Sequence, residues 1–405
     1  MTQDKTHKVS NVPPLRFPEF SGEWEKFALS DFTERVTRRN KGNACRLPLT
    51  ISAQYGLVDQ ITFFNKQIAS ADMSNYYLMK KGEFTYNKSY SGDYPWGAVK
   101  RLDRYDEGCL SSLYICFSLK PFVNSDFITH YFETTKWYRG VSEIAGEGAR
   151  NHGLLNIAIP DYFATKHYLP ASSEEQQKIA DLFNLLTKRI ETQIRVIDKL
   201  ESLIKGIVVT HFSNVSNKQV ITIADLGEAY SVGNLSKEDL SNDGEPCILY
   251  GELFTTYGCV AQYIKSKTNK FKQATLSKIN DLLFPASTTV DATSLIAPTS
   301  IQTSGVYVAG DLFGIHVSNK YDSQYISYLL NYVYNKELAK YAQGSTIIHL
   351  HYDDIKDAKI SVPILFEQNK CSHLLSLLQK RLTAEKSLLE KHLSQKAYLL
   401  QNMFI

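Results

Sequence analysis

The sequence lacks the motifs of the common nucleotide-using and DNA-modifying enzymes. It has neither a Gly-x-x-x-x-Gly-Lys-Ser/Thr phosphate loop nor a Gly-x-Gly-x-x-Gly fingerprint. Its one Pro-Pro pair, at residues 13–14, lacks the flanking Asn or Asp and aromatic residue of an amino-methyltransferase signature. Because a phosphate loop supplies the groups that hold nucleotide phosphates, ATP or GTP hydrolysis is not expected. We predict no catalytic residue and no cofactor bound by this chain.

Metal-ligand patterns and long apolar runs are also missing. The six cysteines are scattered without a Cys-x-x-Cys pair, and His349-x-His351 has no third ligand nearby in the sequence. A zinc site needs such spacing, so we predict no metal centre. The adjacent carboxylates at 174–175 and 353–354 are typical of helix starts rather than of acid–base catalysis. No run reaches 18 apolar residues, and we expect a soluble cytoplasmic protein with reduced thiols.

Net charge is low, at +3 with a pI near 8.3, and by itself indicates no nucleic acid. The sequence does contain an internal repeat with a period near 195 residues, which indicates duplicated domains rather than a solenoid. Four segments recur in the same order at offsets of 192 to 198 residues. The matched pairs are 29–34 with 223–228, 82–85 with 280–283, 125–132 with 323–330, and 175–178 with 367–370.

Each copy has short β-like runs, at residues 110–119 and 305–317, followed by a long amphipathic helix. In residues 174–210, Ile190, Ile197 and Ile204 are seven residues apart, which is typical of a coiled-coil seam. Pro170 precedes this helix, and Ser172 with Glu175 predicts a capping box at its start. The second copy runs from Phe366 to the end of the chain, with a stripe of leucines between residues 374 and 393.

We therefore predict an α+β protein with two similar domains, at residues 1–172 and 213–365. Two antiparallel coiled-coil spacer helices, at residues 173–212 and 366–405, would separate them. A helix of about 37 residues spans roughly 55 Å, against ~34 Å between successive major grooves on one face of duplex DNA. Two different domains on such a spacer predict an asymmetric, split DNA target.

Several motifs resemble those of the specificity (S) subunits of type I restriction–modification systems. They are LRFPEFSGEWE at 15–25, EQQKIA at 175–180, GSTIIHL at 344–350, ISVP at 360–363 and EQNK at 367–370. The resemblance covers nearly the whole chain. It implies that the two domains are target-recognition domains that bind double-stranded DNA. It also implies docking of two methyltransferase (M) subunits along the spacer helices and recruitment of restriction (R) subunits. It also implies that S-adenosylmethionine, ATP and Mg bind to those partner subunits.

The first domain departs from this pattern. Where the second domain has Gly-Ser-Thr at 344–346, the first has GEGARN at 146–151, and 27 rather than 23 residues separate this loop from the long helix. Contacts cannot be transferred between the domains by position alone.

The first domain's candidate DNA contacts are basic, amide, hydroxyl and aromatic residues in loop-like segments, because such side chains contact phosphates or bases. They are Arg38, Arg39, Lys41, Lys80, Lys81, Asn87, Lys88, Ser89, Tyr90, Tyr94, Trp96, Lys100, Arg101, Arg104, Arg150, Asn151 and His152. Most lie between residues 80 and 104, after a predicted strand at 83–86.

The second domain offers a lysine-rich segment without acids at 262–280 for phosphates, and hydroxyl groups for reading bases. The candidates are Lys265, Lys267, Lys270, Lys272, Ser287, Thr288, Thr289, Ser345, Thr346 and His349.

Two other functions stay open. A coiled-coil scaffold without DNA would explain the helices but not two large loop-rich domains. A DNA-modifying enzyme with unrecognised motifs would explain DNA affinity but not the duplicated arrangement.

Overall fold

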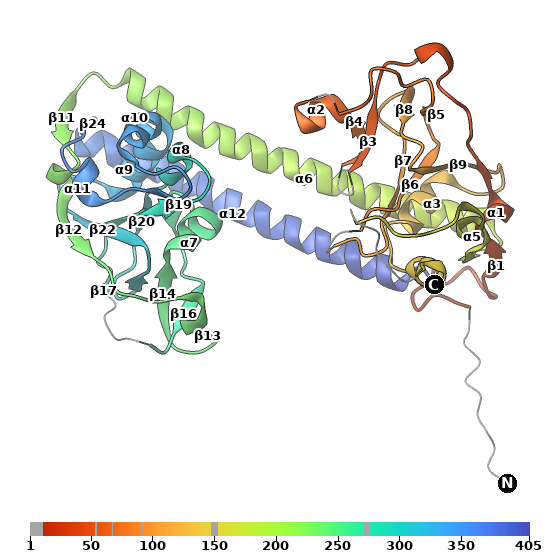
Figure 1. Cartoon of the computed structure of the whole chain (residues 1–405). Coiled ribbons are helices and arrows are strands. Elements are labelled where there is room, and N and C mark those ends of the chain that lie inside the picture. The colour runs from red at the N-terminus through yellow and green to blue at the C-terminus, as the bar shows by residue number, and fades with distance from the viewer. Residues whose placement is uncertain (1–10, 53–54, 67, 91–92, 147–152, 271–274) are drawn as a thin grey trace, which may run out of the picture. The chain divides into compact units, whose positions relative to one another are not determined.

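The computed structural model describes residues 11–405, apart from 53–54, 67, 91–92, 147–152 and 271–274 (Figure 1). The chain folds into two compact units. Unit 1 comprises Met1–Gln193 and Leu388–Ile405, and unit 2 comprises Ile194–Ser387. The two long helices, α6 (Ser173–Asn214) and α12 (Leu365–Asn402), each contribute residues to both units. Both were predicted, and each begins within one residue of its predicted start.

The predicted seam of α6 is buried. Ile190, Ile197 and Ile204 are at most 8% exposed. On α12 the leucine stripe is only partly confirmed, because Leu375 and Leu382 are buried whereas Leu374 and Leu393 are 46% and 48% exposed. The helix thus buries a narrower face than its sequence suggests.

The long helices pair in an antiparallel sense within each unit. In unit 1, Lys396 donates a hydrogen bond to Thr187, with Nζ 3.0 Å from Oγ1. In unit 2, Lys386 Nζ lies 2.7 Å from Glu201 Oε1. Further along, His211 Nε2 lies 3.6 Å from Glu367 Oε2. Residue numbers rise along α6 as they fall along α12, which is the predicted pairing.

The start of α6 is held by the opening segment of the chain. The predicted capping box is half right: the Glu175 amide donates to Ser172 Oγ over 3.2 Å. The Glu175 carboxylate instead accepts two hydrogen bonds of 2.7 Å from the Arg16 guanidinium and one from the Trp24 indole. Glu175 is almost fully buried, so its carboxylate needs these hydrogen-bond donors. Both donors belong to the motif at 15–25, which explains why this motif and the start of the helix occur together.

Unit 1 contains a four-stranded sheet in the order β2-β9-β6-β7 and three strand pairs, β1-β10, β3-β4 and β5-β8. The strands are β1 (Glu25–Ala28), β2 (Thr33–Arg35), β3 (Leu49–Ser52), β4 (Gly56–Asp59), β5 (Tyr77–Lys80), β6 (Phe84–Asn87), β7 (Ala98–Arg101), β8 (Glu107–Leu110), β9 (Ile115–Leu119) and β10 (Lys166–Leu169). The short helices are α1 (Leu29–Phe32), α2 (Gln60–Phe64), α3 (Ser125–Tyr131), α4 (Tyr138–Ile144) and α5 (Ile159–Ala164). The apolar run at 110–119 therefore belongs to two strands, not one: Leu110 ends β8, and β9 begins at Ile115 after a turn that closes from Tyr114 N to Ser111 O.

Unit 2 contains two five-stranded sheets, in the orders β12-β22-β18-β20-β15 and β13-β16-β14-β21-β17, and the pairs β11-β24 and β19-β23. The strands are β11 (Lys218–Thr222), β12 (Gly227–Ser231), β13 (Leu240–Ser241), β14 (Glu245–Leu249), β15 (Val260–Ala261), β16 (Ser266–Thr268), β17 (Thr275–Leu276), β18 (Asp281–Pro285), β19 (Ser287–Thr288), β20 (Thr299–Ile301), β21 (Tyr307–Ala309), β22 (Leu312–Val317), β23 (Ile348–His349) and β24 (Lys359–Pro363). The short helices are α7 (Tyr250–Glu252), α8 (Ala292–Leu295), α9 (Ser323–Leu329), α10 (Asn335–Leu338) and α11 (Tyr352–Ile355). The run at 305–317 is again two strands, separated at Gly310, whose φ of +102° favours glycine.

The two units repeat one topology, as the sequence predicted. The order β2-β9-β6-β7 of unit 1 recurs in unit 2 as β12-β22-β18-β20, and the pair β1-β10 recurs as β11-β24. The turn before β6 has Gly82 at φ +88°, and the turn before β18 has Asn280 at φ +72°, at the matching position. Because left-handed backbone is uncommon outside glycine, this shared turn is strong evidence of duplication.

Candidate nucleic-acid interface

In unit 1, the segment after β6 is held in an extended conformation beside a second segment, residues 153–155. The Tyr90 amide donates to Gly153 O, the Leu155 amide donates to Lys88 O, both over 3.0 Å, and Ser89 pairs with Leu154. Ser89 and Tyr90 are exposed, and Asn87 Oδ1 accepts a hydrogen bond from the Ser89 amide. The backbone is therefore fixed while the hydroxyl and phenol side chains face solvent.

In unit 2, the segment after β18 has the same arrangement. Strand β19 pairs with β23, with Ser287 opposite His349 and Thr288 opposite Ile348. Two backbone hydrogen bonds of 2.9 and 2.7 Å between Gln343 and His349 close the intervening loop. The structure thus brings together two groups of predicted site residues that are about 60 residues apart in the chain.

The loop 343–349 presents its polar side chains to solvent. Ser345, Thr346 and His349 are exposed, as is Thr289 beyond β19. Gly344 makes the tight turn possible, because it has φ +119° and an added Cβ would lie 2.0 Å from Ile347 O. Exposed hydroxyl and imidazole groups on a fixed backbone suit hydrogen bonding to base edges.

These two places correspond in the repeat, and we call them the paired-segment sites: residues 87–90 with 153–155, and residues 287–289 with 343–349. Each follows the same strand of the repeated sheet and pairs with a segment that precedes the last strand of its unit. Arg150, Asn151 and His152, which were predicted to contact DNA, lie outside the described residues.

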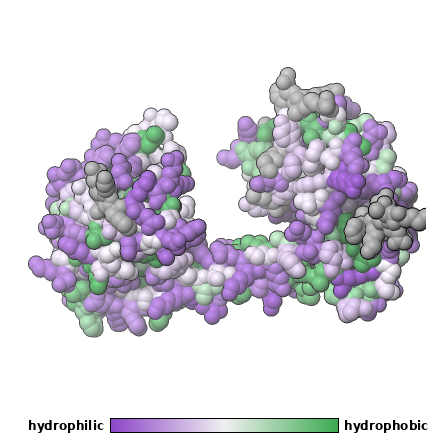
Figure 2. All heavy atoms as spheres, turned by 90° about the horizontal axis from the view of Figure 1, so that it is seen from below, coloured by the Kyte–Doolittle hydropathy of each residue, from purple (hydrophilic) through white to green (hydrophobic). Residues whose placement is uncertain are grey.

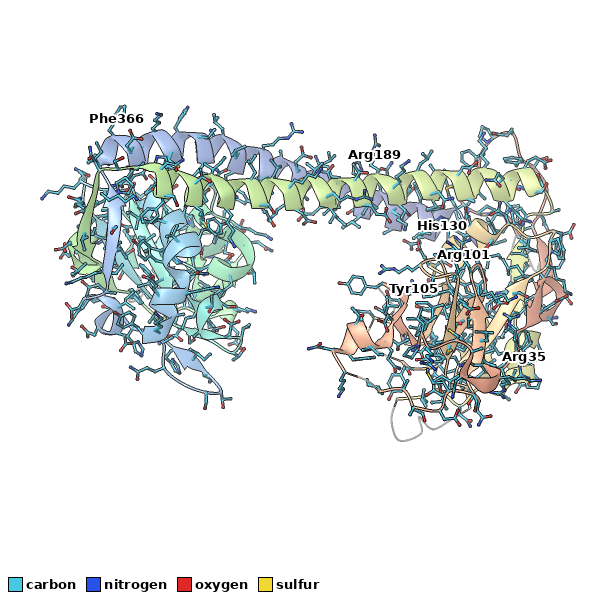
Figure 3. The ribbon with its side chains drawn as sticks, turned by 90° about the horizontal axis from the view of Figure 1, so that it is seen from above. Arg35, Arg101, Tyr105, His130, Arg189 and Phe366 are labelled. Atoms are coloured by element: carbon cyan, nitrogen blue, oxygen red, sulfur yellow. The ribbon has the colours of Figure 1, made fainter. Side chains whose placement is uncertain are left out.

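Several predicted basic residues of unit 1 have partners within the unit. Arg38 Nη2 lies 2.7 Å from Glu83 Oε1, and the Arg39 guanidinium stacks 4.4 Å from the centre of the Tyr77 ring. Arg101, labelled in Figure 3, contacts Asp103 at 2.6 Å and Asp126 at 2.7 Å. These ion pairs neutralise part of the positive charge that was predicted to bind DNA phosphates.

Other predicted residues lie in different surroundings. Lys41, Lys80, Lys81 and Arg104 are exposed, and Lys81 Nζ is 3.6 Å from Asp106 Oδ1. By contrast, Trp96 packs against the hydrophobic core, and its carbonyl accepts a hydrogen bond from Tyr86. Tyr94 and Lys100 line a cavity together instead of the outer surface.

The lysines of unit 2 lie on and beside β16. Lys265, Lys267 and Lys270 are exposed, and Lys270 makes an ion pair with Asp239. Lys272 lies outside the described residues. The structure keeps Lys265 and Lys267 available for phosphate contacts.

The sequence reasoning passed over one exposed aromatic cluster. Tyr55, Phe63 and Phe64 are 58%, 44% and 44% exposed, and the Phe63 and Phe64 rings lie 5.0 Å apart at the end of α2. Ile61 and Ile68 beside them are also exposed. Two adjacent phenylalanines normally indicate a buried segment of the hydrophobic core. The only signal against burial was that the helix that carries them is short.

His349 and His351 are the two histidines for which the sequence predicted no metal site, and the centres of their rings lie 6.1 Å apart. Within the part of the chain that the structure describes, no group of three or more His, Cys, Asp or Glu residues could hold a metal ion. No described helix is long and apolar enough to cross a membrane. Of the two pairs of adjacent carboxylates, Asp353-Asp354 begins α11, where Asp354 accepts a hydrogen bond from the His351 amide.

Comparison with known proteins agrees with this arrangement. Residues 215–391 match the family model of the type I restriction modification DNA specificity domain. The fold resembles that of a type I restriction-modification S subunit from M. genitalium, with a TM-score of 0.61 at 16% identity, over 97% of this chain and 99% of that one. A chain from a structure describing complex assembly of the type I R-M system gives a TM-score of 0.53 at 13% identity, over 96% and 98% of the two chains. No curated protein matches the sequence.

Residues 215–391 are thus similar to a DNA specificity domain of the type I restriction–modification class. The fold of the chain resembles that of the S subunits of these systems over nearly its whole length.

Proposed function

We propose that the chain reads an asymmetric, split DNA sequence, with one half recognised by each unit. The paired-segment sites carry this proposal. They occupy corresponding places in the repeat, yet one presents Ser89 and Tyr90 and the other presents Ser345, Thr346 and His349. Because hydrogen-bond donors and acceptors of different geometry select different bases, the two halves of the target differ.

We also propose that the long helices serve as the docking surface for two M subunits, through which R subunits are recruited. Exposed leucines on both helices support this, among them Leu185 at 68% and Leu203 at 49% on α6 and Leu377 at 52% on α12. Hydrophobic residues lie among polar ones on the surface of these helices (Figure 2). Large exposed apolar side chains in a row typically mark a protein interface. The chain itself performs no catalysis, and S-adenosylmethionine, ATP and Mg bind to the partner subunits.

The test is to express the chain with its M subunits and to sequence the methylated positions of the DNA. The expected result is one split motif with adenine methylation. The double variant Ser345→Ala with Thr346→Ala should relax the sequence preference at one half only. The variant Tyr90→Ala should relax the other half.

A matched control is Thr303→Ala, which removes an exposed hydroxyl from the β20–β21 loop and should leave both halves unchanged. Methylation of DNA by the purified chain with S-adenosylmethionine alone would identify it as an enzyme. A chain that does not bind duplex DNA even with its M subunits would be a scaffold. Either result would contradict the proposal.

A further inference from the structure

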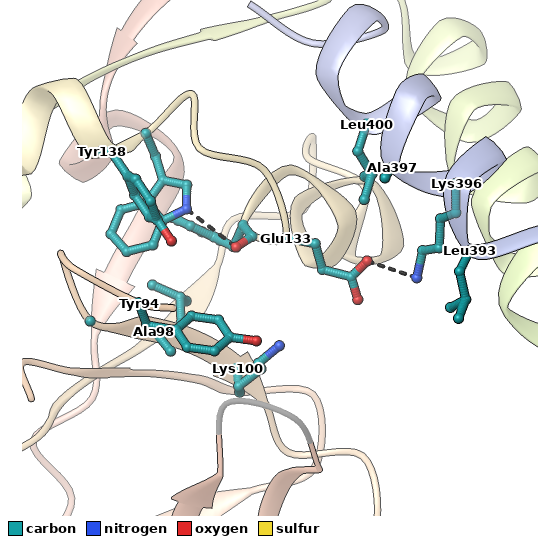
Figure 4. Close-up of a pocket in the computed structure, with 13 residues that line it drawn as sticks. Tyr94, Ala98, Lys100, Glu133, Tyr138, Leu393, Lys396, Ala397 and Leu400 are labelled. Carbon is teal, nitrogen blue, oxygen red and sulfur yellow. Dashed lines mark hydrogen bonds and ion pairs between the residues drawn. The ribbon is translucent and has the colours of Figure 1, made fainter. Parts of the chain in front are cut away.

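Unit 1 contains a cavity of about 450 Å³ that the proposed function does not use (Figure 4). It lies between β7, the start of α4 and the last turns of α12, and its volume is that of a small-molecule site. The side chains that give it its chemistry are Tyr94, Lys100, Glu133, Tyr138, Leu393 and Lys396. Cations and aromatic rings therefore line the same cavity.

Glu133, the acidic residue that lines the cavity, already has two basic neighbours. Glu133 Oε2 lies 2.9 Å from Lys396 Nζ and 3.6 Å from His130 Nδ1. Burial alone would raise the pKa of Glu133, but the neighbouring His130 side chain and the charge of Lys396 lower it to about 2. Glu133 is ionised at neutral pH, and its charge is balanced by Lys396.

Lys100 is left as the surplus cation. Its side chain extends from β7 into the cavity (Figure 4), and it makes no hydrogen bond or ion pair with the residues that the structure describes. Burial lowers the pKa of this ammonium group, and the charge of Glu133, which raises the pKa, does not offset that effect. A partly buried cation that no carboxylate contacts directly is costly, so an anion bound in the cavity would stabilise it.

The second domain shows that the fold does not require this charged set. Lys100 pairs with Thr85 across β6 and β7, and at the matching register of β18 and β20 Leu283 pairs with Thr299. The positions that correspond to Lys100, Glu133 and Lys396 all hold uncharged residues. They are Thr299, Asn331 and Ile204.

Those uncharged residues meet purely structural needs. Thr299 Oγ1 donates to Gly258 O, Asn331 Nδ2 donates to Pro298 O, and Ile204 is buried. One copy of the fold thus packs its long helix with neutral side chains, and the other places two lysines in an open cavity. The difference indicates a role that belongs to unit 1 alone.

We propose that this cavity binds a small organic anion with a phosphate or carboxylate head and a planar body. The head lies at Lys100, next to Lys396, because ammonium groups bind such anions through charge-assisted hydrogen bonds. The body lies against Tyr94 and Tyr138, whose rings offer flat apolar faces. This site involves neither DNA nor a partner subunit and goes beyond the proposed function.

The test is isothermal titration of the full chain with two probes, adenosine monophosphate and benzoate, which carry the two kinds of head. Saturable binding of at least one probe is expected, weakened about tenfold or more by Lys100→Met, because a hydrogen bond to a charged group is lost. Inorganic phosphate and adenosine, which are the head and the body alone, should bind more weakly. The control Lys320→Met removes an exposed lysine of unit 2 that belongs to neither proposed site, and it should leave binding of both probes unchanged.

A second variant, Lys100→Thr, copies the residue that the second domain carries at this place and should also weaken binding. The proposal is wrong if the wild-type chain binds neither probe at millimolar concentration, or if both Lys100 variants bind as tightly as the wild type. Loss of DNA binding in Lys100→Met without any anion binding would also overturn it, since Lys100 would then be a DNA contact.

Discussion

His167, on β10, shows how burial sets the protonation of one residue. Its Nδ1 lies 2.9 Å from the Tyr131 hydroxyl, and its Nε2 lies 2.8 Å from Thr165 Oγ1. The Thr165 hydroxyl donates to Tyr162 O, so it accepts from Nε2–H, and Nδ1 accepts from Tyr131. Both ring nitrogens are satisfied in the neutral form, and burial lowers the pKa of His167 to about 3.

We predict that unit 1 loses stability as the pH falls from about 6.5 towards 3. In this window the unfolded chain binds a proton at His167 whereas the folded chain does not, so the free energy of unfolding falls by up to roughly 1.4 kcal/mol for each pH unit. The variant His167→Gln should make this dependence shallower. Urea unfolding followed by tryptophan fluorescence measures it, because all three tryptophans lie in unit 1.

The control is His373→Gln, which removes an exposed histidine of α12 and should keep the wild-type slope. Equal slopes in wild type and His167→Gln would mean that His167 is not neutral in the folded chain.

At the scale of elements, one glutamine joins each long helix to its domain in the same way. Gln176 Nε2 donates to Pro170 O, and its Oε1 accepts from the Asn124 amide at the start of α3. Gln368 repeats both bonds, with Pro363 O at 2.7 Å and the Asp322 amide, at the start of α9, at 2.9 Å. The Glu-Gln motif shared by the two helix starts therefore has a structural role, because its glutamine fixes each long helix to the backbone of its own unit.

We predict that Gln368→Leu destabilises unit 2 by about 2 kcal/mol, because it removes two hydrogen bonds, one from the part-buried Asp322 amide and one to the buried Pro363 carbonyl. Amide hydrogen exchange at Asp322 should become faster, which localises the effect to the start of α9. Asn369→Leu, at the exposed neighbouring position, is the control and should leave exchange at Asp322 unchanged. Unchanged exchange in Gln368→Leu would show that the amide has another acceptor.

At the scale of the whole molecule, Met403 and Phe404 pack into the hydrophobic core that residues 24–186 form in unit 1. Phe404 is fully buried in unit 1, with its ring centre 5.3 Å from that of Phe127 and 5.6 Å from that of Phe183. Trp24 also packs against it. The core of unit 1 thus joins residues that are far apart in the sequence.

We predict that Phe404→Ala destabilises unit 1 by about 3–5 kcal/mol, the usual cost of removing a buried phenylalanine. Tryptophan fluorescence should report a lower denaturation midpoint for unit 1. Phe366→Ala removes a 69% exposed ring that projects from the first turn of α12 (Figure 3) and should leave that midpoint unchanged. A Phe404→Ala chain with a wild-type midpoint would mean that the C-terminus is not part of the unit 1 core.

Much of the architecture could be predicted because its signals are local or repeated. The heptad isoleucines of α6 and the matched helix starts predicted both long helices and their antiparallel pairing. The apolar runs at 110–119 and 305–317 were each taken as one strand, since hydrophobicity does not show a tight turn inside a buried segment. The equivalence of Ser89 and Ser287 was predicted from offsets, and the structure places both in corresponding strand pairings.

The sequence by itself determined the duplication, the long helices and the resemblance to type I specificity subunits, because periodicity and motif order need no knowledge of distant contacts. Only the tertiary structure decided which charges are available. Arg101 is paired with acids, Lys100 faces a cavity, and Lys265 stays exposed. The reason is physical: the environment of a charged side chain is set by residues from other elements that pack beside it. Lys396 and Glu133, for example, form an ion pair although they are far apart in the sequence, and no local pattern in the sequence indicates this contact.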